Sequence, residues 1–330
     1  MNAAQAWREA ARRLKDGQET ALVRDLTSGA ILLEGMSTED VYLQRMMEQK
    51  SAKGGCELME MDSHLCCRQP LCAKPQLVIC GGGHVAYHAA RLGHMLDFDV
   101  TVIDDRLEFA NPQRFPFARV LCCPFDEAMT QVDGGSNYYF VIATRGHAWD
   151  SQCLEQALRR ESAYVGMIGS RSKISYVMEQ MRRAGIPQQK LDGVYSPIGL
   201  DIGAVTPAEI AVAIAGQLVQ VRSQKNGGVY VGDDVLDSLL NGQAKAAVTI
   251  LRQKGSSPRG AGAVMTVCHD GTIRGTVGGG DAEQQAITLA MQLKHGEVRQ
   301  MSYDMSAKTA SQLGMVCGGH VELLLESLEV

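Results

Sequence analysis

The last third of the chain carries residue types that suit an anionic ligand able to bind sulfur. They lie in Gly255-Ser256-Ser257-Pro258-Arg259, Gly278-Gly279-Gly280-Asp281-Ala282-Glu283 and Met315-Val316-Cys317-Gly318-Gly319. Arginine suits bidentate contact with phosphate. Successive glycines before a helix offer unhindered backbone N–H groups, which form an anion nest. The sequence therefore predicts a small-molecule site made of Ser256, Ser257, Arg259, Gly278, Gly279, Gly280, Glu283 and Cys317.

Each of these segments also has a structural explanation without a ligand. The glycines can form tight hairpins, Glu283 can cap the adjacent helix, and Cys317 can be a buried thiol. Against this, nearby N–H groups favour the thiolate form of a cysteine, which is the form that binds metals. Because all three segments follow one another closely, the sequence favours a ligand site in which Cys317 contacts a metal or sulfur atom.

A second glycine motif, of another kind, lies nearer the amino terminus. Leu77-Val78-Ile79-Cys80 is followed by Gly81-Gly82-Gly83-His84-Val85-Ala86, a G-x-G-x-x-A pattern after an apolar strand. In such a pattern the small residues allow a tight turn, close approach to a phosphate and close helix packing. A helix starting near His84 would point its N–H groups at the phosphate. The next apolar strand ends at Asp104, whose carboxylate could accept hydrogen bonds from ribose hydroxyls.

This motif predicts a nucleotide-type site at Gly81, Gly83, His84 and Asp104, with two questions left open. Asp105 and Arg106 follow Asp104, so the sequence does not separate NAD from NADP. A Rossmann-type domain that binds no dinucleotide would carry the same pattern. His147 is the proton donor available if the chain is an NAD(P)-dependent oxidoreductase.

The elements that position the second motif alternate between strands and helices. Short apolar strands are expected at 77–80, 100–103, 119–122, 139–143 and 164–168, with helices at 85–95, 151–160, 173–184 and 207–222. Apolar strands joined by helical crossovers indicate a parallel sheet covered on both faces. The fold class is therefore α/β, with a Rossmann-like doubly wound parallel sheet in residues 74–225.

Residues 226–330 have a different pattern, which follows the polar segment 223–228. Strands are expected at 246–251, 263–267, 272–277 and 321–325, with a turn at His269-Asp270-Gly271 and a helix at 282–293. This order indicates a second, α+β domain. Residues 1–73 begin with an amphipathic helix at 3–15 and an apolar segment at 20–23, and they form either a separate lobe or a part of the last domain.

Composition narrows the function classes. Hydrophobic residues make up 45% of the chain and the net charge is -5, which gives no reason to expect nucleic-acid or membrane binding. The chain shows no signal peptide, and its ten cysteines therefore indicate reduced thiols in the cytoplasm. Cys66, Cys67 and Cys72, with His64, have soft-ligand chemistry but fit no standard metal spacing, so this segment is expected to be a loop.

With these residues in view, the chain resembles the XdhC/CoxI family of xanthine dehydrogenase accessory proteins. In the Rossmann part the resemblance rests on 80–85, 144–147, 164–173 and 203–211, and in the last part on 255–259, 278–283 and 316–319. The family usually places the cysteine-bearing domain before the Rossmann domain. In this chain the order is reversed.

The resemblance implies binding and delivery of a cofactor rather than turnover of a metabolite. Family members bind the molybdenum cofactor (molybdopterin), help it to acquire a sulfido ligand from a cysteine desulfurase, and deliver it to a xanthine dehydrogenase-type molybdenum hydroxylase. The resemblance also implies a homodimer. The expectation is therefore a cytoplasmic cofactor chaperone, with two alternatives: an NAD(P)-dependent oxidoreductase, or a scaffold that docks the desulfurase and binds nothing in its glycine loops.

Overall fold

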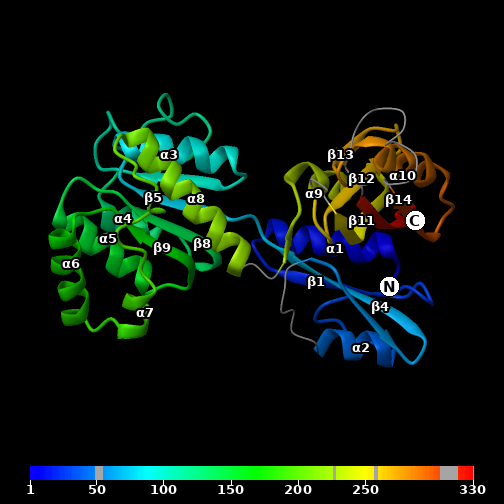
Figure 1. The fold of residues 1–330 in the computed structure, drawn as a ribbon. Helices are drawn as coiled ribbons and strands as arrows, with labels where there is room; N and C mark the ends of the chain where they lie inside the picture. Colours follow the sequence, from blue (N-terminus) through cyan, green and yellow to red (C-terminus); the bar gives the residue numbers. More distant parts are fainter. Residues whose placement is uncertain (49–54, 226–227, 256–258, 305–318, 330) are drawn as a thin grey trace. The chain divides into compact units, whose positions relative to one another are not determined.

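The computed structural model describes residues 1–48, 55–225, 228–255, 259–304 and 319–329, except the side chains of His147 and Lys225. It divides the chain into two compact units (Figure 1). Residues 74–225 form the first, called here the Rossmann unit. Residues 1–73 fold together with residues 226–330 into the second, called here the composite unit. Of the two arrangements considered for residues 1–73, the structure has the one in which they are part of the last domain.

The Rossmann unit is built on a parallel sheet of five strands in the order β7-β6-β5-β8-β9. The strands are β5 (Gln76–Cys80), β6 (Asp99–Ile103), β7 (Arg119–Leu121), β8 (Gly135–Ile142) and β9 (Ser162–Met167). This order reverses direction between β5 and β8, which is the position where doubly wound sheets open a crevice for ligands. The expected α/β fold with a Rossmann-like sheet is confirmed.

Helices cover both faces of this sheet. They are α3 (His84–Met95), α4 (Phe125–Thr130), α5 (His147–Leu158), α6 (Arg171–Arg183), α7 (Gln188–Asp192) and α8 (Pro207–Lys225). One buried cluster joins the strands to α4, α5 and α6, and another joins them to α3 and α8. Because both faces of β5, β6, β8 and β9 are largely buried, these strands are mostly apolar runs, and this is why the sequence alone located them.

In its described residues, the composite unit contains two further sheets, each with five strands. The first has the order β10-β4-β1-β2, with β3 paired to β4, and the second has the order β13-β12-β11-β15-β14. The strands of the first sheet are β1 (Thr20–Asp25), β2 (Ile31–Leu33), β3 (Glu57–Met61), β4 (His64–Cys72) and β10 (Val229–Tyr230). Those of the second are β11 (Ala244–Gly255), β12 (Val264–Cys268), β13 (Ile273–Gly275), β14 (Val298–Asp304) and β15 (Gly319–Ser327).

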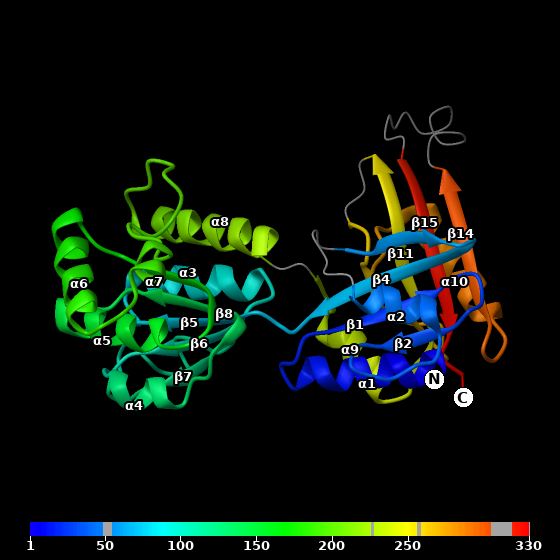
Figure 2. The same ribbon diagram turned by 90° about the horizontal axis from the view of Figure 1, so that it is seen from below.

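The helices that the structure describes on these sheets are α1 (Ala3–Lys15), α2 (Val41–Glu48), α9 (Asp233–Leu240) and α10 (Gly280–Gln292). One buried cluster joins α1 and α9 to strands of both sheets, α2 packs on the first sheet, and α10 packs on the second. Figure 2 shows both chain ends on the same side of this unit.

A buried ion pair joins the two sheets of the composite unit. The Arg24 guanidinium on β1 donates to both carboxylate oxygens of Glu326 on β15, at 2.8 and 3.0 Å. Each side chain is 2% exposed, and the Trp7 indole N–H of α1 donates to the same carboxylate at 2.9 Å. The first helix, the first strand and the last strand therefore form one core.

The structure corrects two expectations in the segment around Cys66. Residues 64–72 form strand β4 rather than a loop; polar residues such as Arg68 and Gln69 hid the strand, although both are buried. Cys67 is bonded to Cys56 in a disulfide, so the expectation that all thiols are reduced is wrong at this pair. The antiparallel pairing of β3 with β4 brings these cysteines close enough to bond, with Cα atoms 6.4 Å apart.

The sequence also missed short elements and edge elements, including α2, α4, α7, α9, β2, β3, β10 and β14. Strand β14 is one example: its burial alternates between intermediate and exposed, because among the described strands it pairs with β15 alone, at the sheet edge. Such a strand lacks the continuous apolar run that marks a central strand.

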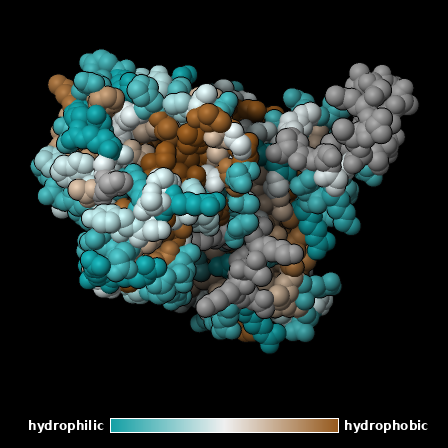
Figure 3. All heavy atoms as spheres, turned by 60° about the vertical axis from the view of Figure 1, so that its left-hand side comes forward, coloured by the Kyte–Doolittle hydropathy of each residue, from teal (hydrophilic) through white to brown (hydrophobic). Residues whose placement is uncertain are grey.

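The surface shows both polar and apolar regions. In Figure 3 hydrophilic residues cover much of the face drawn, and hydrophobic residues gather in a patch in its upper part. Among the exposed apolar side chains are Val205, just before α8, and Val212 and Val219 on that helix. Within the described part of the chain, no helix combines the length and apolar character required to cross a membrane.

Candidate functional site

One end of the second sheet of the composite unit collects the attachment points of all three predicted site segments. The register pairs Gly255, the last residue of β11, with Gly319, the first residue of β15. In sequence, Ser256 directly follows Gly255, and Cys317 lies two residues before Gly319, so both are next to directly opposed positions. β13 ends level with the middle of β11, since Gly275 pairs with Met265 and Met265 pairs with Val248. The chain then continues toward this end of the sheet, where the Asp281 carboxylate at the start of α10 lies 3.5 Å from the hydroxyl of Tyr303 on β14. Figure 2 shows β11 and β14 ending there.

The glycine turn after β13 has a backbone that only glycine readily adopts. Gly278, Gly279 and Gly280 have φ values of 121°, 76° and 69°. Gly279 is the N-cap of α10, and its ψ of -172° completes a conformation that is almost exclusive to glycine. A Cβ atom on Gly279 or Gly280 would have no atom within 4 Å, so the turn is open. Conformation rather than crowding therefore requires glycine here.

The carboxylate of Glu283 fills part of this turn. Its Oε2 atom accepts hydrogen bonds from the hydroxyl of Thr276 at 2.5 Å and from the amides of Val277 and Gly279 at 2.9 and 3.1 Å. Of the two roles left open for Glu283, the structure shows the internal contact. The amide of Gly278 donates to the Thr276 hydroxyl at 3.0 Å.

The amides that remain available belong to the first turn of α10. Gly280, Asp281 and Ala282 are its first three residues, whose N–H groups have no partner inside a helix. No described residue accepts a hydrogen bond from them. A helix start of this kind attracts an anion through its exposed N–H groups and the helix dipole.

Three of the predicted site residues, Ser256, Ser257 and Cys317, lie outside the described residues. Arg259 is described and exposed. The predicted contacts of these residues with a ligand therefore stay predictions. The fixed points on the structure are the two strand ends next to them, Gly255 and Gly319.

The glycine turn of the Rossmann unit is packed rather than open. Gly81 has a φ of 115°, and a Cβ atom there would lie 2.3 Å from the carbonyl oxygen of Ala143. A Cβ on Gly82 would lie 2.2 Å from the carbonyl oxygen of Phe109. Only Gly83, the N-cap of α3, has open space around it, and His84 beside it is exposed.

Asp104 directly follows β6, and its carboxylate is already engaged within the chain. One oxygen accepts from the amide of Gly82 at 2.8 Å and from Arg106 Nη2 at 3.0 Å. The other accepts from the amide and Nε of Arg106 at 3.1 and 2.9 Å. A carboxylate has about four acceptor positions, so none is left for a ribose hydroxyl. The predicted ribose contact would require these bonds to break.

The same bonds tune the charge of Asp104. Burial alone would raise its pKa, but the hydrogen bonds from Arg106 and Gly82 outweigh burial and lower the pKa below its usual range. The guanidinium carbon of Arg106 also lies 3.8 Å from the centre of the Phe109 ring. The sequence analysis considered Arg106 only for the choice between NAD and NADP, and it did not predict this pairing with the acid two residues earlier.

A second polar network lies where β8 and β9 end. The Asp150 carboxylate on α5 is fully buried, accepts from the hydroxyl of Thr144 at 2.7 Å, and pairs with the ammonium of Lys173 on α6. Nearby, Arg145 pairs with Asp105 at 2.8 Å. This network holds the crevice edge of the sheet together. The side chain of His147, the candidate proton donor, is outside the described part of the structure.

The cysteine and histidine cluster gives no metal centre in the residues that the structure describes. Burial raises the pKa of Cys66 to about 11 and that of Cys72 to about 12. Both groups are therefore thiols at neutral pH, whereas a metal binds the thiolate. His64 instead contacts Asp25 at 2.6 Å through Nδ1.

Comparison with known families matches both units. Residues 77–218 match the XdhC Rossmann domain, and residues 238–304 match the XdhC and CoxI family. One curated relative is "Uncharacterized protein YqeB" of Escherichia coli (strain K12), 31% identical over 160 residues, which are 48% of this chain and 29% of that protein. Another, from Bacillus subtilis (strain 168), is named as a probable subunit of xanthine dehydrogenase and is 28% identical over 157 residues, which are 46% of this chain and 44% of that protein. The matched region spans less than half of each relative.

A crystal structure of a protein named xanthine dehydrogenase, from Bacillus halodurans, has a related fold. It superimposes with a TM-score of 0.50 and 22% sequence identity, over 64% of this chain and 66% of that one. At this identity the likeness concerns the fold alone.

Proposed function

Because the chain belongs to the XdhC and CoxI family, with matches on the Rossmann unit and on the unit that follows it, we propose that it is an accessory protein of a xanthine dehydrogenase-type molybdenum hydroxylase. In this proposal it binds the molybdenum cofactor as cargo, supports its sulfuration, and takes part in its insertion into the hydroxylase. The hydroxylase and a cysteine desulfurase are the proposed partners.

The observation that carries the proposal is the shared sheet end in the composite unit. Gly255 and Gly319 are opposed there, and Asp281, which follows the glycine turn, contacts Tyr303 of β14 near the same end. Segments that lie more than 50 residues apart in sequence therefore attach side by side. A ligand with a phosphate at one end and a metal at the other needs donors gathered in this way.

The described residues fit an anionic group at this position. The amides of Gly280, Asp281 and Ala282 have no acceptor in the described part of the chain, and the space beside Gly279 and Gly280 is open. These amides and Arg259 would hold the cofactor phosphate, and Cys317 would provide a soft contact near molybdenum. The cofactor itself supplies the redox chemistry, which takes place in the hydroxylase.

The test is cofactor uptake by the full chain. We expect the wild-type chain, purified anaerobically from cells that make the cofactor, to carry molybdenum and pterin in similar amounts. Cys317→Ala and Arg259→Gln should each lower both contents at least fivefold. Cys122→Ala is the matched control, because Cys122 is an exposed cysteine of the Rossmann unit and should have no effect. Equal uptake by the wild type and both site variants would refute the assigned site.

A second measurement tests the accessory role. A xanthine dehydrogenase-type hydroxylase produced with this chain should contain more sulfurated cofactor, and have higher activity, than the same enzyme produced without it. The same comparison with added cysteine desulfurase would detect the proposed third partner. If the chain takes up cofactor but has no effect on the hydroxylase, it is a cofactor carrier only, and the proposed accessory role is wrong.

The alternative of an NAD(P)-dependent oxidoreductase finds less support. The start of α3 and the open position at Gly83 suit a phosphate, but Asp104 has no acceptor position left for a ribose. Titration with NADH and NADPH, followed by nicotinamide fluorescence, tests this alternative. A Kd below about 10 μM for either nucleotide, together with hydride transfer, would favour the oxidoreductase over the cofactor chaperone.

We also propose that the chain forms a homodimer. Exposed Val212 and Val219 lie on α8, the longest helix of the Rossmann unit, and a second copy could cover them across a two-fold axis. Sedimentation velocity should give a dimer for the wild type. Val212→Asp should shift the population to monomer, and a monomeric wild type at 50 μM would refute the proposal.

A further inference from the structure

A cavity of about 480 Å³ lies in the composite unit, at the other end of the second sheet from the glycine turn. Ala244 starts β11, His269 follows β12, and Leu328 follows β15, and all three line this cavity. β11 extends from this cavity to Gly255, over 12 residues and on the order of 35 Å. The cavity is therefore separate from the proposed cofactor site.

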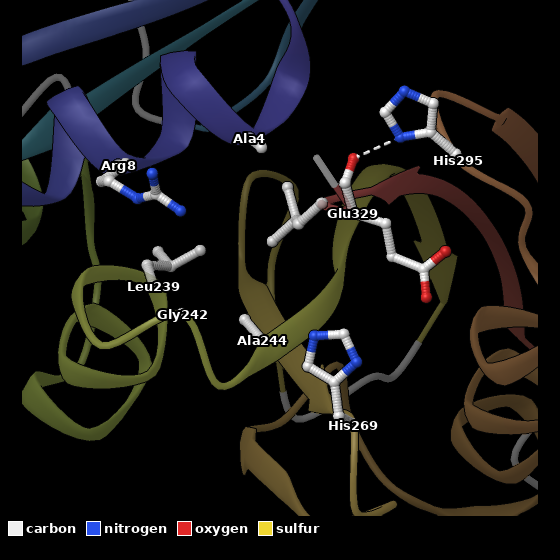
Figure 4. Close-up of a pocket in the computed structure, with 9 residues that line it drawn as sticks. Ala4, Arg8, Leu239, Gly242, Ala244, His269, His295 and Glu329 are labelled. Atoms are coloured by element: carbon white, nitrogen blue, oxygen red, sulfur yellow. Dashed lines mark hydrogen bonds between the residues drawn. The ribbon is translucent and has the colours of Figure 1, made fainter.

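The walls of the cavity are apolar and small, while its polar groups are mostly cationic or neutral donors. Ala4, Leu239, Ala244 and Leu328 supply apolar surface, and Gly242 leaves space. Arg8, His269 and His295 supply nitrogen atoms from three different elements. Figure 4 shows the guanidinium of Arg8 and the ring of His269 directed toward the space between α1 and the strand ends.

Arg8 differs from the other basic residues of α1. Arg12 and Arg13 pair with Glu9, and Lys15 pairs with Asp233 and Asp237. Arg8 has no such partner among the residues that the structure describes. A cation that faces a cavity without a counter-ion favours an anionic ligand there, because the ligand gains charge-assisted hydrogen bonds.

The one carboxylate in the lining does not cancel this positive charge. Glu329 pairs with Lys245 at 2.5 Å, and this hydrogen bond, with a smaller contribution from the nearby histidines, lowers the pKa of Glu329. The carboxylate is therefore ionised and already neutralised by its own lysine. The backbone carbonyl of Glu329 accepts a hydrogen bond from Nδ1 of His295 at 2.7 Å, so that ring nitrogen carries a proton (Figure 4).

The geometry points to a second ligand site in this cavity, for a small organic anion whose carboxylate or phosphoryl group contacts Arg8 and His269. The apolar part of the ligand lies against Leu239 and Leu328. The volume suits a molecule of modest size, since ligand pockets commonly measure about 300 to 1,000 Å³. The guanidinium of Arg8 accommodates both kinds of oxyanion through two parallel N–H donors.

Isothermal titration of the full chain tests this site with four probes: phenyl phosphate, benzoate, inorganic phosphate and neutral benzamide. We expect at least one of the two aromatic anions to bind with a Kd below about 1 mM, and benzamide not to bind. Tighter binding of phenyl phosphate than of benzoate identifies a phosphorylated ligand, and the reverse order identifies a carboxylic acid. If neither aromatic anion binds with a Kd below about 1 mM, or if neutral benzamide binds equally well, the proposal is wrong.

Variants locate the binding. Arg8→Gln and His269→Gln should each weaken the tighter anion at least fivefold, whereas Arg12→Gln, on the same helix, should not. Arg259→Gln should also leave this affinity unchanged, while it lowers cofactor uptake, so the two sites can fail independently. If Arg8→Gln and His269→Gln, both shown by circular dichroism to be folded, bind like the wild type, the anion does not bind in this cavity.

Discussion

The two glycine turns of the chain look alike in sequence and differ in three dimensions. In both turns a carboxylate accepts hydrogen bonds from backbone amides. Asp104 accepts one from Gly82, and Glu283 accepts one each from Val277 and Gly279. The Rossmann turn is enclosed by backbone, with Ala143 and Phe109 oxygens where Cβ atoms would be, whereas Gly279 and Gly280 face open space. A glycine motif therefore shows where the backbone is unusual, and the surroundings decide whether a ligand can reach it.

The largest expected effect follows from crowding in the Rossmann turn. Gly81→Ala should destabilise the Rossmann unit by about 3 kcal/mol or more, because the new Cβ meets the Ala143 oxygen and the φ of 115° disfavours any side chain. The chain has two tryptophans, one in each unit, so urea unfolding followed by Trp149 fluorescence in a Trp7→Phe background isolates this unit.

The control for this prediction is the neighbouring glycine. Gly83→Ala places its Cβ in open space at a helix N-cap and should cost less than about 1 kcal/mol. Equal losses for Gly81→Ala and Gly83→Ala would contradict the packed turn.

The second effect tests the carboxylate of the packed turn. Asp104→Asn should cost the Rossmann unit about 2 to 3 kcal/mol at pH 7, because Arg106 and the Gly82 amide lose a charged acceptor. The lowered pKa of Asp104 stabilises the fold above the unfolded value, near 4, and this stabilisation is lost as the pH falls through the folded value.

Urea unfolding between pH 7 and pH 2.5 tests whether the stabilisation by Asp104 decreases as the pH falls. The difference in unfolding free energy between the wild type and Asp104→Asn should narrow below about pH 4. A difference that stays constant down to pH 2.5 would show that Asp104 is not held by these bonds.

The third effect is the cost of a side chain in the open turn. Gly279→Ala should cost the composite unit about 1.5 kcal/mol through backbone strain alone, since φ is 76° and no atom lies within 4 Å. Trp7 fluorescence in a Trp149→Phe background reports on this unit. A loss as large as that of Gly81→Ala would mean that the open turn is as crowded as the packed one.

The smallest effect concerns the carboxylate of the open turn. Glu283→Gln should cost about 1 kcal/mol, because the amide oxygen still accepts a hydrogen bond but carries no charge. Hydrogen exchange at the Val277 and Gly279 amides should accelerate. Asp281→Asn, in the same helical turn, is the matched control and should leave both amides unchanged.

Much of the Rossmann unit could be predicted from the sequence. Strands β5, β6, β8 and β9 are largely buried on both faces, so each is mostly an apolar run bounded by polar residues or glycine. The composite unit was predicted less completely. Strand β4 is buried yet carries Arg68 and Gln69, and a local pattern cannot show that such residues find partners across a sheet, as Gln69 does with the Gly262 carbonyl at 2.7 Å.

The sequence alone determined where the glycines, the strand ends and the candidate acids lie along the chain, because these follow from local conformation and short-range periodicity. The tertiary structure alone decided which of these groups remain available. Arg106 and Gly82 donate hydrogen bonds to the Asp104 carboxylate, and Lys245 forms an ion pair with Glu329. Arg8, by contrast, faces a cavity. The physical reason is that hydrogen bonds and ion pairs are satisfied through space, by partners whose positions the fold sets.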